Sequence, residues 1–555
     1  MISSGTAVRE TDEGGRVSGA ADGAAPGGAG TDAAGGDGRA SDGRASGEGA
    51  IDRRQTRLLL FSILVVALCG IVYQLIIGAI ASYLLGNSVL QFSLTVGVFM
   101  FAMGIGSLLS RYLGGDLLRC FVWTEIVIAL VGGACGIALF VAFPFARPLF
   151  ELVMYAMIVV IGTLVGLEIP LLTSLLARSR SIRQSISEVM TLDYVGALIG
   201  SMLFPLVLLP TLGPVRAAFA IGLMNIAVAL VSVIAFRELL GRQYRSMLIA
   251  SVGTVLLLCA AMVYGTRLTA FAEKHLYFDT IVFSERTPYQ NLVVTRSATS
   301  EDTRLFIDGH IQFSSRDEHR YHEYLVHPAM SPEGPRANVL VLGGGDGLAA
   351  RELLKYPDVE RIDLVDIDPE MTRIHTELPM LRELNGASLL DERVHLFHED
   401  AFNFVNRAGR RYDRVIVDFP DPHNDAIGKL YSREFYTMIE RRMNAGAVMT
   451  TQSSSPFFTR RVFWSIERTL GAVFEDVESY HTALPSFGIW GFNMARKGAA
   501  LPDDYPVRVP TRAIGNASMA AATAFDADMA RLPDSPVNSI MQPRLYTLYL
   551  EDLQG

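Results

Sequence analysis

Long apolar runs dominate the first half of the chain, from residue 57 to about residue 264. Each run has about 18 residues or more, the length that a helix needs to cross the hydrocarbon core of a bilayer. We expect seven membrane-spanning helices, near 58–84, 91–110, 121–143, 150–176, 193–212, 216–236 and 246–264. The pattern therefore predicts a helical, multi-pass membrane domain at 57–265, located in the cell membrane.

The segment before these runs, 1–56, has a different composition. It consists largely of Gly, Ala, Asp, Ser and Arg and has few large apolar side chains. Such a segment buries too little apolar surface to offset the entropy lost on ordering, so we expect a disordered, low-complexity tail. The apolar run that follows it is longer than the core of a signal peptide, which predicts an anchor that is not cleaved.

After residue 265 the apolar runs become short. Residues 266–332 alternate apolar and polar side chains in "NLVVTR" and "RLFIDGHIQF", with a DG turn in the second, which predicts a small antiparallel β unit. From 333 to 500, strands such as "NVLVLGGG" and "RYDRVIVDF" alternate with helical stretches. This alternation predicts βαβ units and a mostly parallel sheet, followed by a C-terminal extension at 501–555.

Composition narrows the possible partners. The chain has a net charge of −9 and a mean hydropathy of +0.30. The soluble half has no cluster of Lys and Arg, which excludes nucleic acid as the main partner. The four cysteines lie in or beside apolar runs and form no C-x-x-C pair, so neither a zinc site nor a disulfide framework is predicted.

Carboxylates follow the predicted strands of the α/β domain. Asp346 comes after the first strand, Asp366 ends the second, Asp400 follows the third, and Asp418 and Asp421 follow the fourth. Ligands bind beyond the carboxyl ends of parallel strands, so we expect these groups to converge on one edge of the sheet. The last two lie on a proline-containing turn in "VIVDFPDP", which predicts two fixed carboxylates; ordinary solvated loop acids are the alternative.

The glycine turn in "VLVLGGGDGLAA" is the next motif. Gly343 and Gly345 lack a Cβ, so the backbone can approach a ligand closely. The dinucleotide pattern G-x-G-x-x-G is incomplete because Leu348 stands at its sixth position, and Asp346 occupies the place where a pyrophosphate would approach. Asp366, about 20 residues further on, is placed to accept ribose hydroxyls. The turn therefore predicts a nucleoside without phosphates, such as an S-adenosyl sulfonium compound; strand-to-helix packing alone is the alternative.

The chain resembles spermidine synthases, the polyamine aminopropyltransferase family, from about Tyr289 to Phe492. The resemblance lies in "YQNLVV", "IDGHIQFSSRDEHRYHE", "VLVLGGGDG", "LVDID", "HEDAFNFV", "DFPDP", "LYSREFY" and "LPSFGIWGF", which occur in the family's order. The apolar half resembles the membrane region fused to some bacterial members. The implied fold is a multi-pass α-helical membrane domain, then a Rossmann-like α/β domain of the class I methyltransferase type with a small N-terminal antiparallel β unit.

The resemblance also implies roles for individual residues. It places the nucleoside of decarboxylated S-adenosylmethionine against four residues, Gln290, Asp366, Asp400 and Ala401. It places the amine substrate against His322, Asp346 and Asp421, and it makes Asp418 the proton acceptor. The chain departs from the family after "DP", where the family has a short Gly-Pro segment. Here "HNDAIGK" follows, and Asp425 stands in the position of that segment. It also departs at Asp366, usually glutamate, and at Ala401, usually glycine.

The implied reaction is transfer of an aminopropyl group to putrescine or a related diamine, which gives spermidine and methylthioadenosine. Decarboxylated S-adenosylmethionine is a co-substrate, and neither a metal nor a permanently bound cofactor is expected. The bilayer is the expected partner of the apolar half, and a homo-oligomer is possible. Two alternatives remain: a class I methyltransferase, and a non-catalytic membrane sensor or transporter of polyamines.

One feature of the apolar half bears on the alternative of a polyamine sensor or transporter, and a second bears on helix packing. Glu168 lies deep in an apolar run, where an ionisable residue is a candidate for function, although a structural polar contact is an equal alternative. The small-residue pairs Gly162/Gly166 and Gly196/Gly200 predict close packing of helices.

Basic residues in the loops predict the orientation in the membrane. Arginines cluster near 53–57, 111–119, 178–183 and 237–245, whereas the intervening loops contain only Arg147 and Arg216. The positive-inside rule puts the N-terminus in the cytoplasm, and seven crossings would then put the α/β domain outside. The implied co-substrate predicts a cytoplasmic α/β domain, so the two expectations conflict.

Overall fold

The computed structural model describes residues 52–85, 88–145, 149–178, 181–277, 279–407 and 409–554. The disordered tail predicted at 1–56 therefore lies outside the described residues, except for its last few positions. Arg147 and Arg180, which entered the charge argument, also lie outside them.

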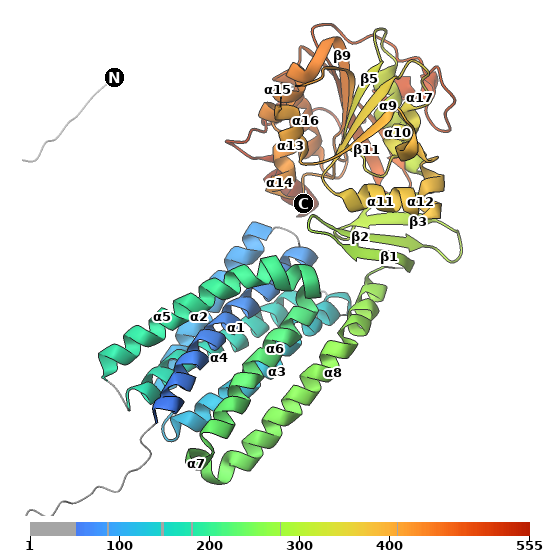
Figure 1. Ribbon diagram of the computed structural model, residues 1–555. Coiled ribbons are helices and arrows are strands. Elements are labelled where there is room, and N and C mark those ends of the chain that lie inside the picture. The colour runs from blue at the N-terminus through green and yellow to red at the C-terminus, as the bar shows by residue number, and fades with distance from the viewer. Residues whose placement is uncertain are drawn as a thin grey trace, which may run out of the picture. The chain divides into compact units, whose positions relative to one another are not determined.

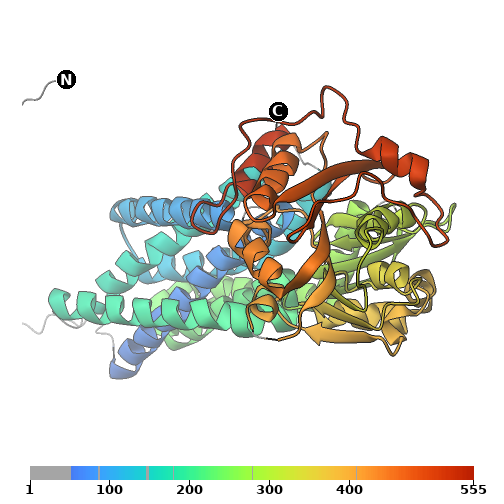
Figure 2. The same cartoon turned by 90° about the horizontal axis from the view of Figure 1, so that it is seen from above.

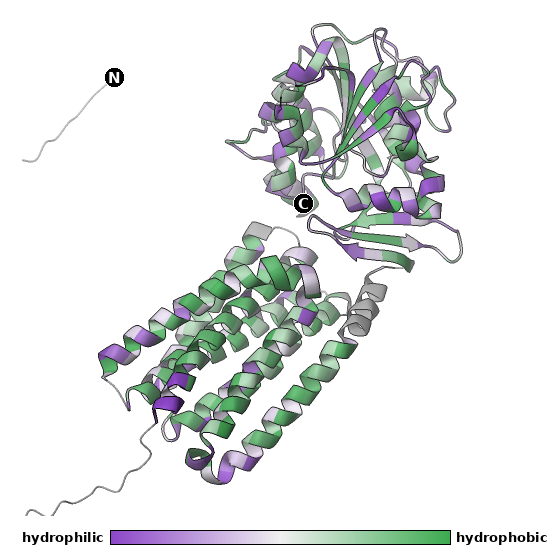
Figure 3. Ribbon diagram, viewed as in Figure 1, coloured by the Kyte–Doolittle hydropathy of each residue, from purple (hydrophilic) through white to green (hydrophobic). Residues whose placement is uncertain are grey.

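The apolar half forms a bundle of long helices (Figure 1). In Figures 1 and 2 these helices run roughly side by side, and Figure 3 shows that apolar residues cover most of their length. The helices are α1 Arg53–Leu85, α2 Ser88–Leu109, α3 Leu117–Phe145, α4 Phe150–Leu176, α5 Ile182–Leu203, α6 Leu209–Ala235, the short α7 Arg237–Leu240 and α8 Tyr244–Leu276.

Six helical stretches among the described residues are long and apolar enough to cross a membrane. Five of them each contain one predicted segment. The predicted segments 193–212 and 216–236 share the sixth, Ile182–Ala235, which has 54 residues. At 1.5 Å per residue this stretch would span about 80 Å, far more than the roughly 30 Å of a bilayer core.

A bend explains this length. A π-helical segment, Phe204–Leu208, joins α5 to α6, and Gly213 then leaves the helical conformation with φ +69° and ψ 171°. Pro214, which follows, has no N–H for the helical ladder. Both α5 and α6 pack against α1, so the chain folds back between them. The count of seven crossings stays a prediction.

The predicted close packing of small residues is confirmed. A Cβ on Gly166 of α4 would lie 2.1 Å from the carbonyl oxygen of Met103 in α2. A Cβ on Gly196 of α5 would lie 2.3 Å from the carbonyl oxygen of Leu64 in α1. Only glycine permits these backbone approaches, which dispersion forces favour within a bilayer.

The predicted small β unit is a four-stranded antiparallel sheet in the order β1-β2-β3-β4. Asp308 and Gly309 join β3 to β4 with φ values of +49° and +83°, as the DG turn predicts. The strands are β1 Thr280–Arg286, β2 Asn291–Arg296, β3 Thr303–Ile307 and β4 His310–Ser314.

The α/β domain contains a seven-stranded sheet in the order β10-β11-β9-β8-β5-β6-β7. The five strands from β9 to β7 are parallel, and β11 and β10 add an antiparallel edge. The strands are β5 Asn338–Gly343, β6 Arg361–Asp366, β7 Val394–His398, β8 Tyr412–Asp418, β9 Met443–Gln452, β10 Asp476–Leu484 and β11 Gly488–Arg496.

Helices cover both faces of this sheet, with α9 and α10 on one side and α13, α15 and α16 on the other (Figure 1). Alternate residues of β5 face the two layers: Val339 and Val341 join the first core, and Leu340 and Leu342 join the second. The helices are α9 Glu318–Met330, α10 Leu348–Leu353, α11 Pro369–Glu377, α12 Pro379–Leu384, α13 Ala401–Asn406, α14 Asp425–Gly428, α15 Arg433–Arg442, α16 Arg460–Gly471, α17 Asn516–Ala522 and α18 Leu545–Gln554.

Candidate active site

The site lies where the order of the parallel strands reverses. From β5 the chain continues outward to β6 and β7, then returns to β8 on the other side of β5. The loops after β5 and β8 therefore diverge and leave a crevice, the usual ligand position in such sheets. Asp346 follows β5, and Asp418 ends β8.

A cavity of about 540 Å³ occupies this crevice. Its volume is in the range of small-molecule sites. All ten residues singled out from the sequence line it: Gln290, His322, Gly343, Gly345, Asp346, Asp366, Asp400, Ala401, Asp418 and Asp421. The structure thus brings the predicted site together, while the role of each residue stays a prediction.

The glycine turn has a more specific cause than close approach to a ligand. A Cβ on Gly343, whose φ is +80°, would lie 2.1 Å from the carbonyl oxygen of Asp418. A Cβ on Gly345 would lie 2.4 Å from Oδ2 of Asp366. Packing within the protein therefore requires both glycines, and the neighbour of Gly345 is a carboxylate that lines the cavity.

Hydrogen-bonded polar groups form the part of the cavity where the nucleoside is predicted to bind. The backbone N–H groups of Gly345 and Asp368 donate to the Asp366 carboxylate at 3.0 and 2.9 Å. Burial nevertheless raises the pKa of Asp366 to about 6, because the two amides only partly offset the loss of water. The side-chain amide of Gln290 donates to Oδ2 of Asp368 at 2.9 Å, which holds Gln290 at the wall.

Asp400 has two partners within the protein. Its side chain accepts from the Asn403 N–H at 3.0 Å and so caps α13, which begins at Ala401. Lys429 Nζ lies 3.0 Å from its Oδ2, and this lysine also lines the cavity. In the departing segment after Asp421-Pro422, Asn424 lines the cavity and caps α14, whereas Asp425 is not among the lining residues.

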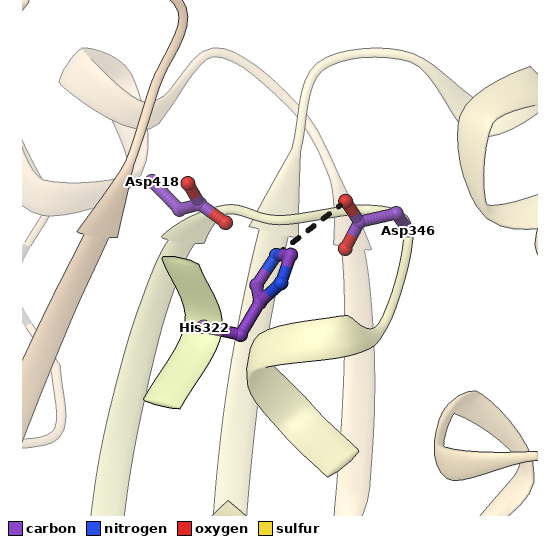
Figure 4. A group of neighbouring side chains, drawn as sticks. All are labelled: His322, Asp346 and Asp418. Atoms are coloured by element: carbon purple, nitrogen blue, oxygen red, sulfur yellow. Dashed lines mark ion pairs between the residues drawn. The ribbon is translucent and has the colours of Figure 1, made fainter. Parts of the chain in front are cut away.

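The predicted amine side is a cluster of acids around one histidine (Figure 4). His322 Nε2 lies 4.0 Å from Oδ2 of Asp346. Tyr321 donates its hydroxyl hydrogen to Oδ1 of Asp418 at 2.6 Å. Burial raises the pKa of Asp418 to about 6, and the Asp346 charge adds to this, while His322 and the tyrosine hydroxyl oppose it.

His322 is held as a cation in this cluster. Burial alone would lower its pKa, but the hydrogen bond with Glu318 and the charges of Asp346 and Asp418 raise it to about 9. Nδ1 of His322 lies 2.8 Å from the Glu318 carbonyl oxygen and 3.1 Å from Glu318 Oε2. Arg351 donates two 2.9 Å hydrogen bonds to the same carboxylate. Burial opposes ionisation of Glu318, but its bonds with His322 and Arg351 lower its pKa to about 2.

Asp421 lines the same cavity. Burial raises its pKa to about 7, although polar contacts with Ser454, Gln452 and Tyr549 favour the carboxylate. One of its carboxylate oxygens, Oδ1, is buried without a geometrically good hydrogen bond among the described residues. That oxygen is available to a donor on a ligand.

Sequence reasoning missed several of these groups. Tyr321, Glu318, Lys429 and Tyr549 are not among the site residues predicted from the sequence. Glu318 lies four residues before His322 on α9, a spacing that places two side chains on one helix face, so it could have been found. Tyr549 lies 128 positions after Asp421 in the chain, and no local pattern connects them.

The cluster has the donor types of a metal site. One ligand atom from each of His322, Asp346 and Asp418 lies within 4.8 Å of the others. A metal would require His322 to be neutral, whereas its surroundings favour the protonated ring. The two carboxylates also match an ammonium ion, and the expectation that no metal is needed stays a prediction.

Fold and cavity together define a Rossmann-like enzyme with an acidic, nucleoside-sized site. The chain matches the family model of the spermine/spermidine synthase domain over residues 318–502. It is 44% identical over 512 residues to polyamine aminopropyltransferase 2 of Ralstonia nicotianae, a match that covers 90% of this chain and 99% of the relative. It is 41% identical over 478 residues to the polyamine aminopropyltransferase of Leptospira interrogans, covering 86% of this chain and 94% of the relative.

A solved structure, the spermidine synthase from Thermotoga maritima, is similar to 44% of this chain and 85% of its own, with 22% identity and a TM-score of 0.41. The chain belongs to the polyamine aminopropyltransferase family. The similarity to the bacterial relatives extends over the apolar half as well as the α/β domain, because it covers about nine-tenths of this chain.

Proposed function

We propose that the protein transfers the aminopropyl group of decarboxylated S-adenosylmethionine to putrescine or a related diamine, giving spermidine and methylthioadenosine. The observation that carries this proposal is the convergence of Asp346, Asp418 and Asp421 on one cavity that Gln290 and Asp366 also line. The first set suits a doubly charged amine, and the second suits a nucleoside.

In the proposed reaction an amine nitrogen attacks the aminopropyl carbon bound to the sulfonium sulfur. The C–N bond forms as the C–S bond breaks, and the electron pair of the latter neutralises the sulfur. The amine is protonated at neutral pH, with a pKa near the roughly 10.4 of lysine, so it must lose a proton to attack. Asp418 is the proposed acceptor, and the Tyr321 hydrogen bond to its Oδ1 fixes its orientation.

The remaining acids supply binding and alignment. Asp346 and Asp421 would hold the distal ammonium, which aligns nitrogen, carbon and sulfur and lowers the entropic part of the barrier. Burial raises the pKa values of Asp418 and Asp421, and the positive charges of both substrates lower them again. The empty site is thus costly to ionise, and the substrates relieve that cost.

The departures from the family bear on the nucleoside. Asp366 has a shorter side chain than the usual glutamate, and Gly345 and Asp368 hold its carboxylate close to the glycine turn. We propose that it still accepts the ribose hydroxyls. Asn424, at the wall of the cavity, then takes the place of the missing Gly-Pro segment.

We also propose that the α/β domain faces the cytoplasm, where the co-substrate would be supplied. With a cytoplasmic N-terminus this needs an even number of crossings. One of the seven expected segments would then enter and leave the membrane on the same side.

The test uses the purified full-length chain with decarboxylated S-adenosylmethionine and a panel of diamines, read by mass spectrometry. Spermidine and methylthioadenosine should appear together, whereas S-adenosylmethionine should give no methylated product. Asp418→Asn should lower kcat by about 10²- to 10⁴-fold, the usual contribution of a general base, and retain donor binding. Asp534→Asn, at an exposed aspartate, is the matched control. Methyl transfer, or full turnover by Asp418→Asn, would contradict the proposal.

A further inference from the structure

The helical bundle contains a second buried group of polar side chains, separate from the α/β cavity. Glu125 of α3 is 0% exposed, and Glu168 of α4 and Asn225 of α6 are each 1% exposed. Tyr73 of α1 is also 0% exposed. Four helices therefore direct polar groups into the interior of an apolar bundle, where ionisable residues are costly to keep.

The hydrogen bonds within this group leave most of its oxygens unused. The Asn225 amide donates to Oε2 of Glu125 at 2.7 Å and to the Glu125 carbonyl oxygen at 3.3 Å. Within the described part of the chain, no residue donates to Glu125 Oε1, to either carboxylate oxygen of Glu168 or to the Tyr73 hydroxyl. Buried polar atoms are normally paired, so these unpaired oxygens need a partner from outside the protein.

The charge of the group is also unmatched. The carboxyl groups of Glu125 and Glu168 lie within electrostatic reach of each other. The ion pairs found in the described ranges include no lysine, arginine or histidine beside either glutamate. Two adjacent carboxyl groups without a cation indicate a site that receives one.

We propose that Glu125 and Glu168 bind a primary ammonium group of a polyamine inside the membrane bundle. An ammonium carries one positive charge and three N–H donors. The pair presents three carboxylate oxygens that no described residue reaches, so one ammonium satisfies all three. Asn225 holds the fourth oxygen and fixes the Glu125 side chain for this contact.

A third acid marks a path from the bundle surface. Asp193 of α5 is partly exposed and lies within electrostatic reach of Glu168. A flexible diamine that enters along α5 meets Asp193 first and the buried pair second, and its two ammonium groups match two acidic positions. Pro170, two residues after Glu168, has no N–H for the α4 ladder, so it frees a backbone carbonyl on the same helix.

The family supplies the reason to prefer an amine over an alkali ion. The same chain carries an α/β domain of the polyamine aminopropyltransferase family, so polyamines are present where the protein works. An alkali ion would need further oxygen ligands in place of its water, beyond the unpaired oxygens of the group. The inference does not depend on which amine the α/β cavity accepts.

The test separates the two sites. The full-length protein in nanodiscs, with the α/β amine site disabled by Asp346→Asn and Asp421→Asn, is titrated with radiolabelled putrescine. About one molecule should still bind per chain, and adding Glu168→Gln should weaken this binding at least ten-fold. Glu151→Gln, at an exposed glutamate of the same helix, is the matched control and should change nothing. Gel filtration and thermal unfolding check the fold of each variant, and Glu168→Asp should retain part of the binding.

Several results would overturn the inference. Loss of all putrescine binding in the Asp346→Asn/Asp421→Asn protein would leave the bundle without an amine site. Unchanged binding in the Glu168→Gln protein would place the second site elsewhere. Competition by NaCl but not by choline chloride at equal ionic strength would make the pair an alkali-ion site. Turnover of the unmodified protein is measured separately, so failure here is distinguishable from failure of the proposed reaction.

Discussion

Single carboxyl groups in the cavity set how the enzyme depends on pH. The pKa of Asp418 is raised to about 6 and that of Asp421 to about 7, chiefly by burial. Each group acts as a carboxylate in the proposed reaction, so each loses its function as the pH falls through its pKa. Protonation of either one weakens capture of the amine or removes the proton acceptor.

We predict that kcat/KM for the diamine, measured with the donor far below saturation, falls as the pH is lowered through about 7 and then about 6. These are free-enzyme values, and kcat/KM reports them. The slope of log kcat/KM against pH should approach two below both values and one in Asp421→Asn. A profile that stays flat between pH 8 and pH 5 would contradict the assignment of both carboxylates.

Glu318 acts through His322 and does not line the cavity itself. Because His322 has a raised pKa of about 9, its ring is protonated in the empty site at pH 8. An arriving ammonium needs acceptors, and His322 Nε2 accepts only when the ring is neutral. Binding of the amine should therefore expel the ring proton.

We predict that diamine binding at pH 8 releases about one proton, because the incoming cation lowers the pKa of His322. Calorimetry in buffers with different ionisation enthalpies measures this number. In Glu318→Gln the ring loses its hydrogen bond with the Glu318 carboxylate, which lowers its pKa, so less proton should be released, while Glu392→Gln, at an exposed residue, should behave like the unmodified protein. Equal proton release in Glu318→Gln would show that another group supplies the proton.

At the scale of elements, the turn between β5 and α10 fixes the donor site through close packing. We predict that Gly345→Ala displaces the Asp366 carboxylate, since the new Cβ would lie 2.4 Å from its Oδ2. Donor affinity should fall at least ten-fold, and stability should fall by about 1–3 kcal/mol from overpacking. Gly471→Ala is the control, because a Cβ there meets no atom within 4 Å. Isothermal titration with methylthioadenosine and thermal unfolding give the two readouts, and unchanged affinity would contradict this account of the turn.

The last helix, α18, reaches the site through Tyr549, which favours the charged form of Asp421. We predict that Tyr549→Phe raises the pKa of Asp421 further, so that kcat/KM begins to fall at a higher pH. Tyr546→Phe, on the same helix, removes a hydroxyl that is buried without a partner, so it should leave the pH profile in place. A profile that moves equally in both variants would assign the effect to the helix and not to the hydroxyl.

The elements that periodicity governs could be predicted from the sequence. The apolar runs, the alternating β unit and the strand-ending acids each depend on a local pattern, and all ten candidate residues line one cavity. The break at Gly213 likewise lies between the predicted segments 193–212 and 216–236. The contact of Tyr549 with Asp421 and the pairing of Glu125 with Glu168 depend on tertiary packing, which a single sequence does not display.

For the whole molecule, the orientation in the membrane decides where the product appears. We predict that a reporter fused to the C-terminus and a single cysteine introduced near Arg53 are both on the cytoplasmic side in intact cells. Labelling with a membrane-impermeant maleimide after mutation of Cys259, the one cysteine exposed in the described part of the chain, measures the second position. A cysteine introduced at the exposed Tyr112 in the loop after α2 provides an internal reference. Labelling of the α/β domain from outside would contradict the proposed orientation and restore the odd number of crossings.

The place of Tyr549 in the wall of the cavity has a consequence for biosynthesis. Domains generally fold in the order in which the ribosome delivers them, and the helices of the apolar half are delivered first. The wall residue on α18 follows the other lining residues in the chain, so it leaves the ribosome after all of them. The nascent protein is therefore inserted and anchored before its catalytic pocket is complete, and no turnover is expected before α18 has been made.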